Sequence, residues 1–207
     1  QAAWPGALDF EQGYLLGMLL GDGTLKQEAA ILSVWQAAAV SGGETCGPTA
    51  LMDEVMRCTQ GLAHRGDFAG WSSVAGRNEW RLKSAPLRDL AFGLGMRPGH
   101  KVITPALEQA SSEAYRGFLR GLFDADGSVQ GSQAKGLSVR LAQSDVDTLR
   151  AVQRMLLRLG ITSRLYSDRR PAGTSRLPDG QGGQRDYAVC AQHELVISGD
   201  SLAHYAE

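Results

Sequence analysis

The sequence predicts an α+β protein built from two repeats, each with the element order α-β-β-α-β-β-α and related by a pseudo-twofold axis. The first observation is a duplicated segment: "YLLGMLLGDG" (residues 14–23) returns as "FLRGLFDADG" (residues 118–127), which places Asp22 104 residues before Asp126. The second observation is that the patterns after each copy follow the same order. Because repeats dictate architecture, we expect one repeat at residues 1–106 and another at 107–207, together forming one domain.

In the first repeat, the apolar helix-like run is followed by a hairpin-like segment, "TLKQEAAILSVWQ". Apolar residues at helical spacing predict a helix within residues 49–62. The alternating segments "WSSVAG" and "EWRLKS" predict two strands joined by a turn at Gly76–Asn78. A short helix is expected over residues 85–95, because Pro86 lies near its start and Gly95 near its end.

The second repeat follows the same order. "SVQGSQAKGLSVRLAQ" predicts a hairpin, and residues 144–160 predict the strongest helix of the chain, with Ser144 as its N-cap and Gly160 at its end. "ITSRLYSD" and "YAVCAQHELVI" predict strands. The linker between them, residues 169–184, is rich in Gly, Pro and Arg and predicts a mobile loop, and "GDSLAHYAE" predicts a last helix.

Composition places the chain among folded proteins, since 43% of its 207 residues are hydrophobic. No apolar run is long enough for a transmembrane helix, and no signal peptide is visible. Three scattered cysteines suit a reducing, intracellular compartment. The net charge of −1 argues mildly against a nucleic-acid binder, but residues 164–185 contain five arginines and two aspartates and could form a locally basic face.

Four glycines lie inside the two duplicated helices, with Gly17 and Gly21 four residues apart and Gly117 and Gly121 four residues apart. A glycine within a helix costs about 1 kcal/mol relative to alanine. Small residues at this spacing leave one helix face without side chains, so another backbone can approach closely. We therefore expect these glycines to form the contact between the two helices.

On these features the chain resembles the LAGLIDADG homing endonucleases, and more narrowly the two-motif endonuclease domains carried inside inteins. The nine motif letters match residues 15–23 and 119–127. In the first copy, Leu20 replaces the first aspartate of the motif. In the second copy, Asp124 matches that aspartate, and we expect it to have a structural role. The resemblance implies two central motif helices and a saddle of antiparallel sheets that lies along the major groove of DNA.

If the two helices lie side by side, Asp22 and Asp126 meet at their ends. Two close carboxylates repel each other, and a hard cation such as Mg²⁺ relieves that conflict. The resemblance implies a site for Mg²⁺, for which Mn²⁺ can substitute, held by both aspartates and by the carbonyls of Gly21 and Ala125. It implies a staggered double-strand break at a long target site, with one aspartate serving each strand.

The resemblance also implies further site residues. Lys101 lies where the family has a lysine near the scissile phosphate, but no lysine follows Lys135 to serve a second centre. Gln143, with Gln36 as its analogue in the first repeat, matches a polar residue that contacts metal-bound water. The strands supply candidate DNA contacts: Lys26, Arg77, Arg81, Lys83, Arg140, Arg164 and Arg169.

The predicted function is thus that of a site-specific, Mg²⁺-dependent homing endonuclease. We expect it to bind double-stranded DNA as a monomer and not to associate with a membrane. Alternatives remain open: a catalytically decayed LAGLIDADG protein or a maturase that binds nucleic acid without cleaving it, or a two-repeat interaction domain. The sequence shows no N-terminal nucleophile and no C-terminal His-Asn pair. We therefore expect an endonuclease domain without its splicing domain, and leave open a fusion to one in the full protein.

Overall fold

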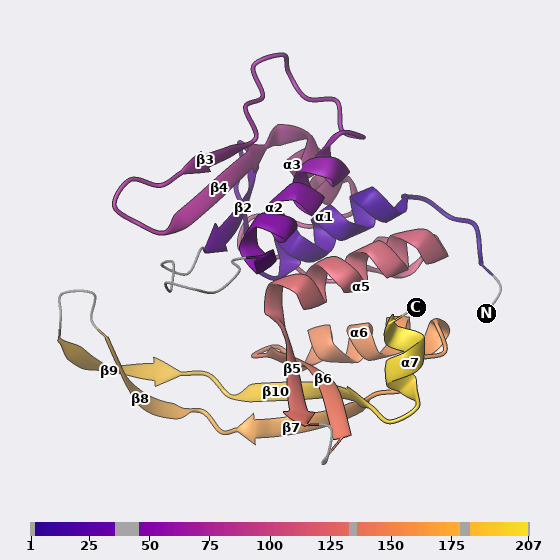
Figure 1. Ribbon diagram of the computed structural model, residues 1–207, viewed down its shortest axis with the longest axis vertical. Coiled ribbons are helices and arrows are strands. Elements are labelled where there is room, and N and C mark those ends of the chain that lie inside the picture. The colour runs from indigo at the N-terminus through magenta and orange to yellow at the C-terminus, as the bar shows by residue number, and fades with distance from the viewer. Residues whose placement is uncertain (1–2, 36–45, 133–135, 179–182, 207) are drawn as a thin grey trace. The chain divides into compact units, whose positions relative to one another are not determined.

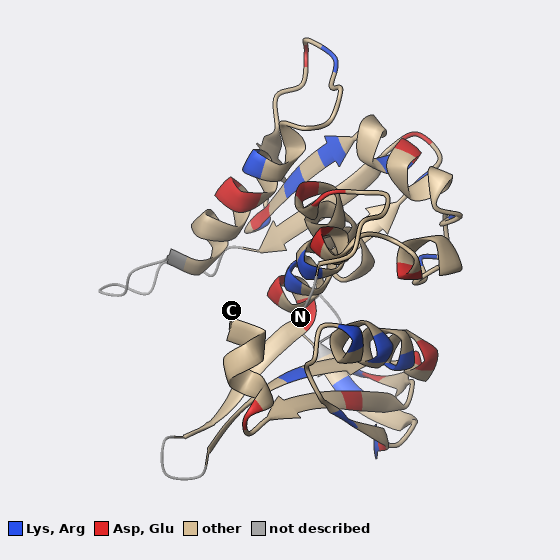
Figure 2. Ribbon diagram, turned by 90° about the vertical axis from the view of Figure 1, so that its right-hand side faces the viewer, with Lys and Arg blue, Asp and Glu red and all other residues tan. Residues whose placement is uncertain are grey.

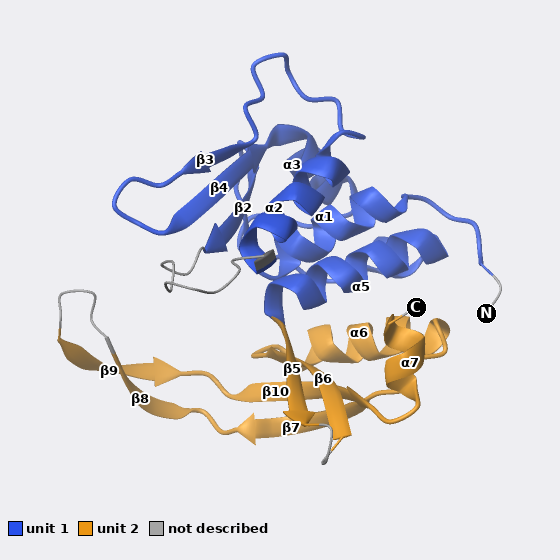
Figure 3. Cartoon of the chain, in the orientation of Figure 1, with its two compact units in different colours: residues 1–126 blue, residues 127–207 orange. Residues whose placement is uncertain are grey.

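The computed structural model describes residues 3–35, 46–132, 136–178 and 183–206. The chain forms two compact units, residues 1–126 and 127–207 (Figure 3). Each unit contains a four-stranded antiparallel sheet and helices, which confirms the predicted α+β class. Within the described ranges, no helix combines the length and the apolar character needed to cross a membrane.

The first unit contains the predicted helices and strands in the predicted order (Figure 1). These elements are α1 (Phe10–Leu20), β1 (Gly23–Leu25), β2 (Ala30–Trp35), α2 (Cys46–Thr59), β3 (Trp71–Ser73), β4 (Glu79–Ser84), α3 (Ala85–Gly93), α4 (Pro105–Glu108) and α5 (Ser112–Asp126). The sheet order is β1-β2-β4-β3. Helix α4, a single turn started by the Thr104 N-cap, was not predicted because four residues show no periodicity.

The two faces of the first sheet differ in character because side chains alternate along each strand. Ala30, Leu32 and Val34 of β2 and Leu82 of β4 are buried in the core. The opposite face, called here the first outer face, presents Ile31, Ser33 and Trp35 of β2 beside Lys83, Arg81 and Glu79 of β4. The core of the unit thus lies on one side of the sheet, and a polar surface lies on the other.

The second unit repeats the sheet of the first and adds a pair of strands. Its elements are β5 (Gly127–Ser132), β6 (Gly136–Gln143), α6 (Val146–Arg158), β7 (Arg164–Arg170), β8 (Gly173–Pro178), β9 (Gln184–Val189), β10 (Gln192–Ser198) and α7 (Ser201–Ala206). The sheet order β5-β6-β10-β7 matches that of the first unit. The second outer face presents Ser138 and Arg140 of β6 beside Ser198, Val196 and Glu194 of β10.

The prediction of a mobile loop at residues 169–184 is wrong for residues 169–170, 173–178 and 184, which lie in strands. Strands β8 and β9 pair along their whole length, from Gly173 opposite Val189 to Pro178 opposite Gln184, and extend the path of β7 and β10 as a ribbon (Figure 1). The Gly and Pro content concealed two short strands, and the single strand predicted at residues 187–197 is interrupted between β9 and β10.

The predicted N-cap of the strongest helix is off by one residue. Asp145, not Ser144, caps α6, because its carboxylate accepts hydrogen bonds from the Asp147 amide at 3.0 Å and the Thr148 hydroxyl at 2.7 Å. Both residues are good N-caps, so the sequence alone does not distinguish them.

Candidate active site at the ends of the motif helices

Helices α1 and α5 run side by side at backbone contact in the first unit (Figure 1). A Cβ atom built at Gly17 would lie 2.7 Å from the Leu122 nitrogen, and one at Gly117 would lie 2.9 Å from the Tyr14 nitrogen. At Gly121 the distance to the Met18 nitrogen would be 3.1 Å. Each glycine therefore faces the backbone of the other helix, where a side chain would not fit.

Gly13 is a fifth contact glycine, which was not predicted. A Cβ atom at Gly13 would lie 3.0 Å from the Ala114 Cα. Gly13 precedes Gly17 by the same spacing of four residues, so extending the pattern backwards by one turn would have found it. The contact face of α1 thus spans Gly13, Gly17 and Gly21, all on one side of the helix.

The C-terminal ends of the two helices meet. A Cβ atom at Gly21 would lie 2.6 Å from the Ala125 Cβ and 3.2 Å from an Asp126 carboxylate oxygen. Burial and the negative charge of Asp126 raise the pKa of Asp22, and the Lys101 ammonium partly offsets this rise. The structure therefore brings together Asp22, Asp126, Gly21 and Ala125, the four residues predicted to bind metal.

The donor atoms at this end fit a hard divalent cation. Two carboxylates and helix-end carbonyls are all oxygen ligands, which Mg²⁺ prefers. Among the described residues, no group of three or more His, Cys, Asp or Glu side chains could enclose a metal. Mg²⁺ commonly takes only one or two carboxylates from a protein, because it keeps several waters and binds substrate phosphates.

Lys101 lies at the end of α1 and points its ammonium at backbone carbonyls. Its Nζ atom donates to the Leu19 carbonyl at 2.8 Å, to the Leu20 carbonyl at 3.2 Å and to the Gly23 carbonyl. Burial lowers the pKa of Lys101, while Asp126 and Asp22 counteract that effect. In this arrangement Lys101 caps the motif helix and places a positive charge near both aspartates.

Replacing Lys101 with Met is expected to lower the free energy of unfolding by about 1–3 kcal/mol, because three carbonyls lose a charged donor. Urea denaturation measures the change. The control is Lys83→Met on an exposed position of β4, with an expected change within about 0.5 kcal/mol. Equal stability losses in the two variants would argue against the capping role.

The raised pKa of Asp22 predicts a dependence of stability on pH. The folded protein holds this proton more tightly than the unfolded chain, so stability falls as the pH rises from the ordinary value of 3.8 through the raised pKa. Without metal, Asp22→Asn is therefore expected to have a higher melting temperature than the parent at about pH 7 and the same one at about pH 3.

Calorimetry at the two pH values checks this expectation. Added Mg²⁺ should raise the melting temperature of the parent protein at neutral pH more than that of Asp22→Asn, since the cation binds the ionised carboxylate. If Asp22→Asn were less stable than the parent at neutral pH without metal, the two carboxylates would not repel each other.

Asp124 has a structural position two residues before the end of α5. The buried Tyr14 hydroxyl donates to its carboxylate at 2.9 Å, and Arg120 lies 3.8 Å away. Arg120 also pairs with Glu54 of α2 at 3.3 Å. These contacts tie α1, α2 and α5 together, and Leu20, the matching residue of the first motif, cannot make them.

An open cavity of about 520 Å³ adjoins this network in the first unit. Asp22 and Asp124 line it on the side of the motif helices, Trp35 on the side of β2 and Glu54 on the side of α2. The end of the motif helices is thus reachable from solvent.

The predicted DNA contacts of the first unit lie on the sheet or its turns. Arg81 and Lys83 share the first outer face, Lys26 is exposed beyond β1, and Arg77 lies in the turn before β4. Figure 2 shows basic residues on strands of both units. Arg77 and Arg81 both approach Glu79, an acid that the sequence analysis did not select.

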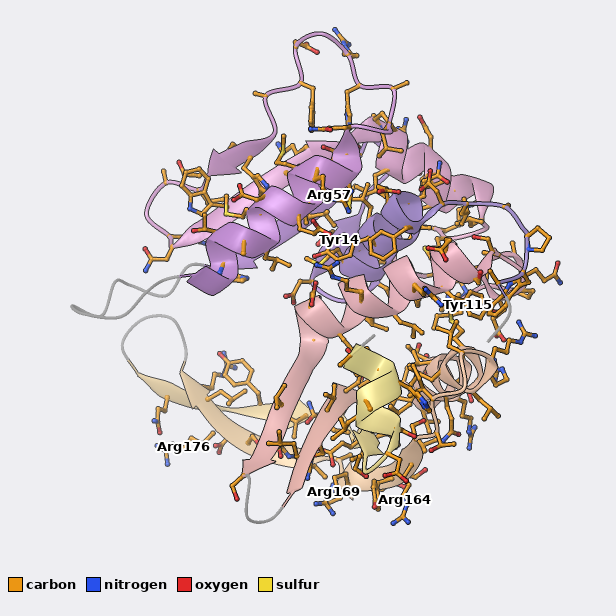
Figure 4. All side chains as sticks on the ribbon, turned by 45° about the vertical axis from the view of Figure 1, so that its right-hand side comes forward. Tyr14, Arg57, Tyr115, Arg164, Arg169 and Arg176 are labelled. Carbon is orange, nitrogen blue, oxygen red and sulfur yellow. The ribbon has the colours of Figure 1, made fainter. Side chains whose placement is uncertain are left out.

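In the second unit, Arg140 lies on β6. Arg164 and Arg169, both labelled in Figure 4, lie on β7. Arg140 and Arg169 both approach Glu194, which the sequence analysis also missed. Gln143 ends β6 opposite His193, and its role beside the metal stays a prediction. Its proposed analogue Gln36 lies outside the described residues.

Part of the chain matches a known family model, and most of it aligns with a known protein. Residues 113–207 match the family model of the LAGLIDADG-like domain. The chain is 26% identical over 189 residues to the ribonucleoside-diphosphate reductase NrdEB subunit alpha of Bacillus subtilis (strain 168). This alignment covers 89% of the chain but only 17% of that relative.

Two solved structures share the fold. The homing-endonuclease structure of an I-DmoI variant with nicked target DNA and Mn superposes with a TM-score of 0.55 at 16% identity, covering 96% of each chain. Full-length DUF199/WhiA from Thermatoga maritima superposes with a TM-score of 0.52 at 11% identity, covering 95% of this chain and 53% of that one. The chain therefore has the fold of a known homing endonuclease, and its residues 113–207 match the LAGLIDADG-like domain.

Proposed function

We propose that the protein is a site-specific homing endonuclease that makes a staggered double-strand break in DNA by Mg²⁺-dependent phosphodiester hydrolysis. The observation that carries this proposal is the meeting of Asp22 and Asp126 at the ends of two helices packed at backbone contact. The two carboxylates repel each other, which contributes to the raised pKa of Asp22. A cation bound by both would explain why they are held so close together. The two repeats, residues 1–106 and 107–207, would act as one monomer.

Asp22 and Asp126, with the carbonyls of Gly21 and Ala125, would hold the cation. When bound, the cation supplies an activated water and charge stabilisation for the phosphate under attack. The two aspartates would place that cation where the helix ends meet. Lys101 fixes the end of α1 through its three carbonyl contacts and adds positive charge beside the two aspartates. Gln143 is proposed to orient a water, which is the role that the family resemblance implies.

The relatives support an inserted element as the origin of the chain. The match lies in a reductase subunit of which it spans 17%, while the shared fold is that of an endonuclease. An endonuclease domain inserted in a reductase chain, as in an intein, accounts for both findings. The proposed target is then the coding sequence of a ribonucleoside-diphosphate reductase that lacks the insertion.

A plasmid-cleavage assay tests the function. Supercoiled plasmid that carries the uninterrupted reductase gene is incubated with the protein and Mg²⁺, with Mn²⁺, and with a chelator. We expect linear product with either metal, none with the chelator, and none from a plasmid in which the insertion point is interrupted. Tight binding to the site without cleavage under both metals would falsify the enzyme and leave the second candidate.

That second candidate is a binding protein on the same scaffold, either a decayed endonuclease or a maturase. Two features favour it: Leu20 replaces an acid in the first motif, and the three donors of Lys101 all face carbonyls. The presence of both Asp22 and Asp126 favours the active enzyme.

A further inference from the structure

Each outer face holds one shielded glutamate between two arginines. On the first outer face, the Glu79 side chain is only 2% exposed. Its carboxylate accepts from the Arg81 Nε atom at 2.5 Å and from the Ser33 hydroxyl at 3.2 Å, and Arg77 lies 3.7 Å away. The hydrogen bond from Arg81 lowers the pKa of Glu79, so the acid is ionised at neutral pH.

The second outer face has the same arrangement. The Glu194 side chain is 15% exposed and lies 3.3 Å from Arg140 and 3.5 Å from the Arg169 Nε atom. The Arg169 guanidinium also lies over the Tyr166 ring, 5.6 Å from its centroid. Arg169 is the last residue but one of β7, and Figure 4 labels its side chain.

The two clusters do not occupy equivalent positions. In the first sheet, Leu82 lies opposite Leu32 of β2, which lies opposite the first residue of β1. In the second sheet, Leu195 lies opposite Leu141 of β6, which lies opposite the first residue of β5. Leu82 and Leu195 therefore occupy equivalent positions. Arg81 therefore corresponds to Glu194, and Glu79 falls two residues earlier on its strand. The two sheets reach the same arrangement from different registers, which a simple copy of one repeat would not produce.

We propose that Glu79 and Glu194 are positioning residues that hold Arg81 and Arg169 for bidentate recognition of guanine, one in each half of the DNA target. This inference rests on the proposed function. The Glu79 carboxylate accepts a hydrogen bond from the Arg81 Nε atom, and the Glu194 carboxylate lies 3.5 Å from the Arg169 Nε atom. In both pairs the contact at Nε leaves the two terminal NH₂ groups of the guanidinium as a fork. That fork is the group that binds guanine O6 and N7 in the major groove.

Both forks remain reachable. The Arg81 side chain is 38% exposed and the Arg169 side chain 56% exposed, although their glutamates are shielded. The glutamates also cancel positive charge that would otherwise attract any phosphate, so sequence-independent affinity falls while base readout is kept. Stability alone does not require the acids, because ion pairs with a solvent-exposed partner contribute only about 0–1 kcal/mol.

Selection from a duplex library with randomised positions tests the proposal without a known target. The parent protein, Glu79→Gln and Glu194→Gln are each used to enrich bound duplexes. The parent is expected to enrich one long site with a guanine preference in each half. Each variant should lose that preference at one or two adjacent positions, Glu79→Gln in one half and Glu194→Gln in the other. Binding to random duplex should tighten a few-fold, with a steeper salt dependence.

Arg81→Lys provides a second route to the same position, because lysine cannot form the bidentate fork. Arg81→Lys should lose the guanine preference that Glu79→Gln is expected to lose. It therefore tests the same position even if a thermal melt shows that Glu79→Gln is unfolded. Enrichment of an unchanged site by Glu194→Gln and by Arg81→Lys would overturn the positioning role while leaving the proposed function intact. A parent protein that enriches no sequence would instead remove the proposed function on which this inference rests.

Discussion

Asp22→Asn and Asp126→Asn are each expected to lower the rate of DNA cleavage by at least about 100-fold, because each removes one of the two carboxylates proposed to hold the cation. DNA binding should be unchanged or slightly tighter, since a negative charge near the phosphates is lost. Single-turnover cleavage of the plasmid substrate and a gel-shift titration measure the two effects.

The matched control for these variants is Asp89→Asn. Asp89 lies on α3, its side chain is 65% exposed, and it pairs with the neighbouring Arg88. The same change of charge there should leave cleavage within about twofold of the parent rate. Full cleavage by either Asp22→Asn or Asp126→Asn would rule out the paired site.

Gly17→Ala and Gly117→Ala are expected to destabilise the fold by about 1–3 kcal/mol or more, because the new methyl groups would collide with the backbone of the other motif helix. The sign is informative, since alanine in a helix is normally favoured over glycine by about 1 kcal/mol. Equilibrium unfolding by urea and by heat measures the change.

Gly93→Ala provides the opposite case within the same chain. Gly93 is the last residue of α3 and has no atom within 4 Å of the position of an added Cβ. This variant is expected to be as stable as the parent or up to about 1 kcal/mol more stable. If Gly17→Ala and Gly93→Ala changed stability in the same direction, the close approach of α1 and α5 would be wrong.

The order of the elements was predictable because both repeats show the same hydrophobic periodicity and both motif helices end in Asp-Gly. The predictions were wrong where a local sequence pattern is compatible with two structures. Ser144 and Asp145 are both adequate N-caps, and the Gly and Pro content of residues 169–184 suits a loop as well as the ribbon of β8 and β9. Tertiary pairing, which composition does not encode, decides between these readings.

The candidate site was predictable to the extent that it rests on repetition. Asp22 and Asp126 stood out because they end matching helices, and the glycine spacing predicted the contact that joins them. Lys101 was selected as a residue near the phosphate, but its carbonyl partners depend on where the chain returns to the end of α1. Glu79 and Glu194 gave no signal, because one acid in a polar strand looks like any exposed charge until the arginines beside it are placed.

Binding of Mn²⁺, followed by electron paramagnetic resonance, tests most directly whether Asp22 and Asp126 form a divalent-cation site. The parent protein should bind Mn²⁺ at saturable sites that Mg²⁺ displaces, and the double variant Asp22→Asn/Asp126→Asn should lose this binding while Asp89→Asn keeps it. Identical Mn²⁺ binding by the parent and the double variant would contradict the account.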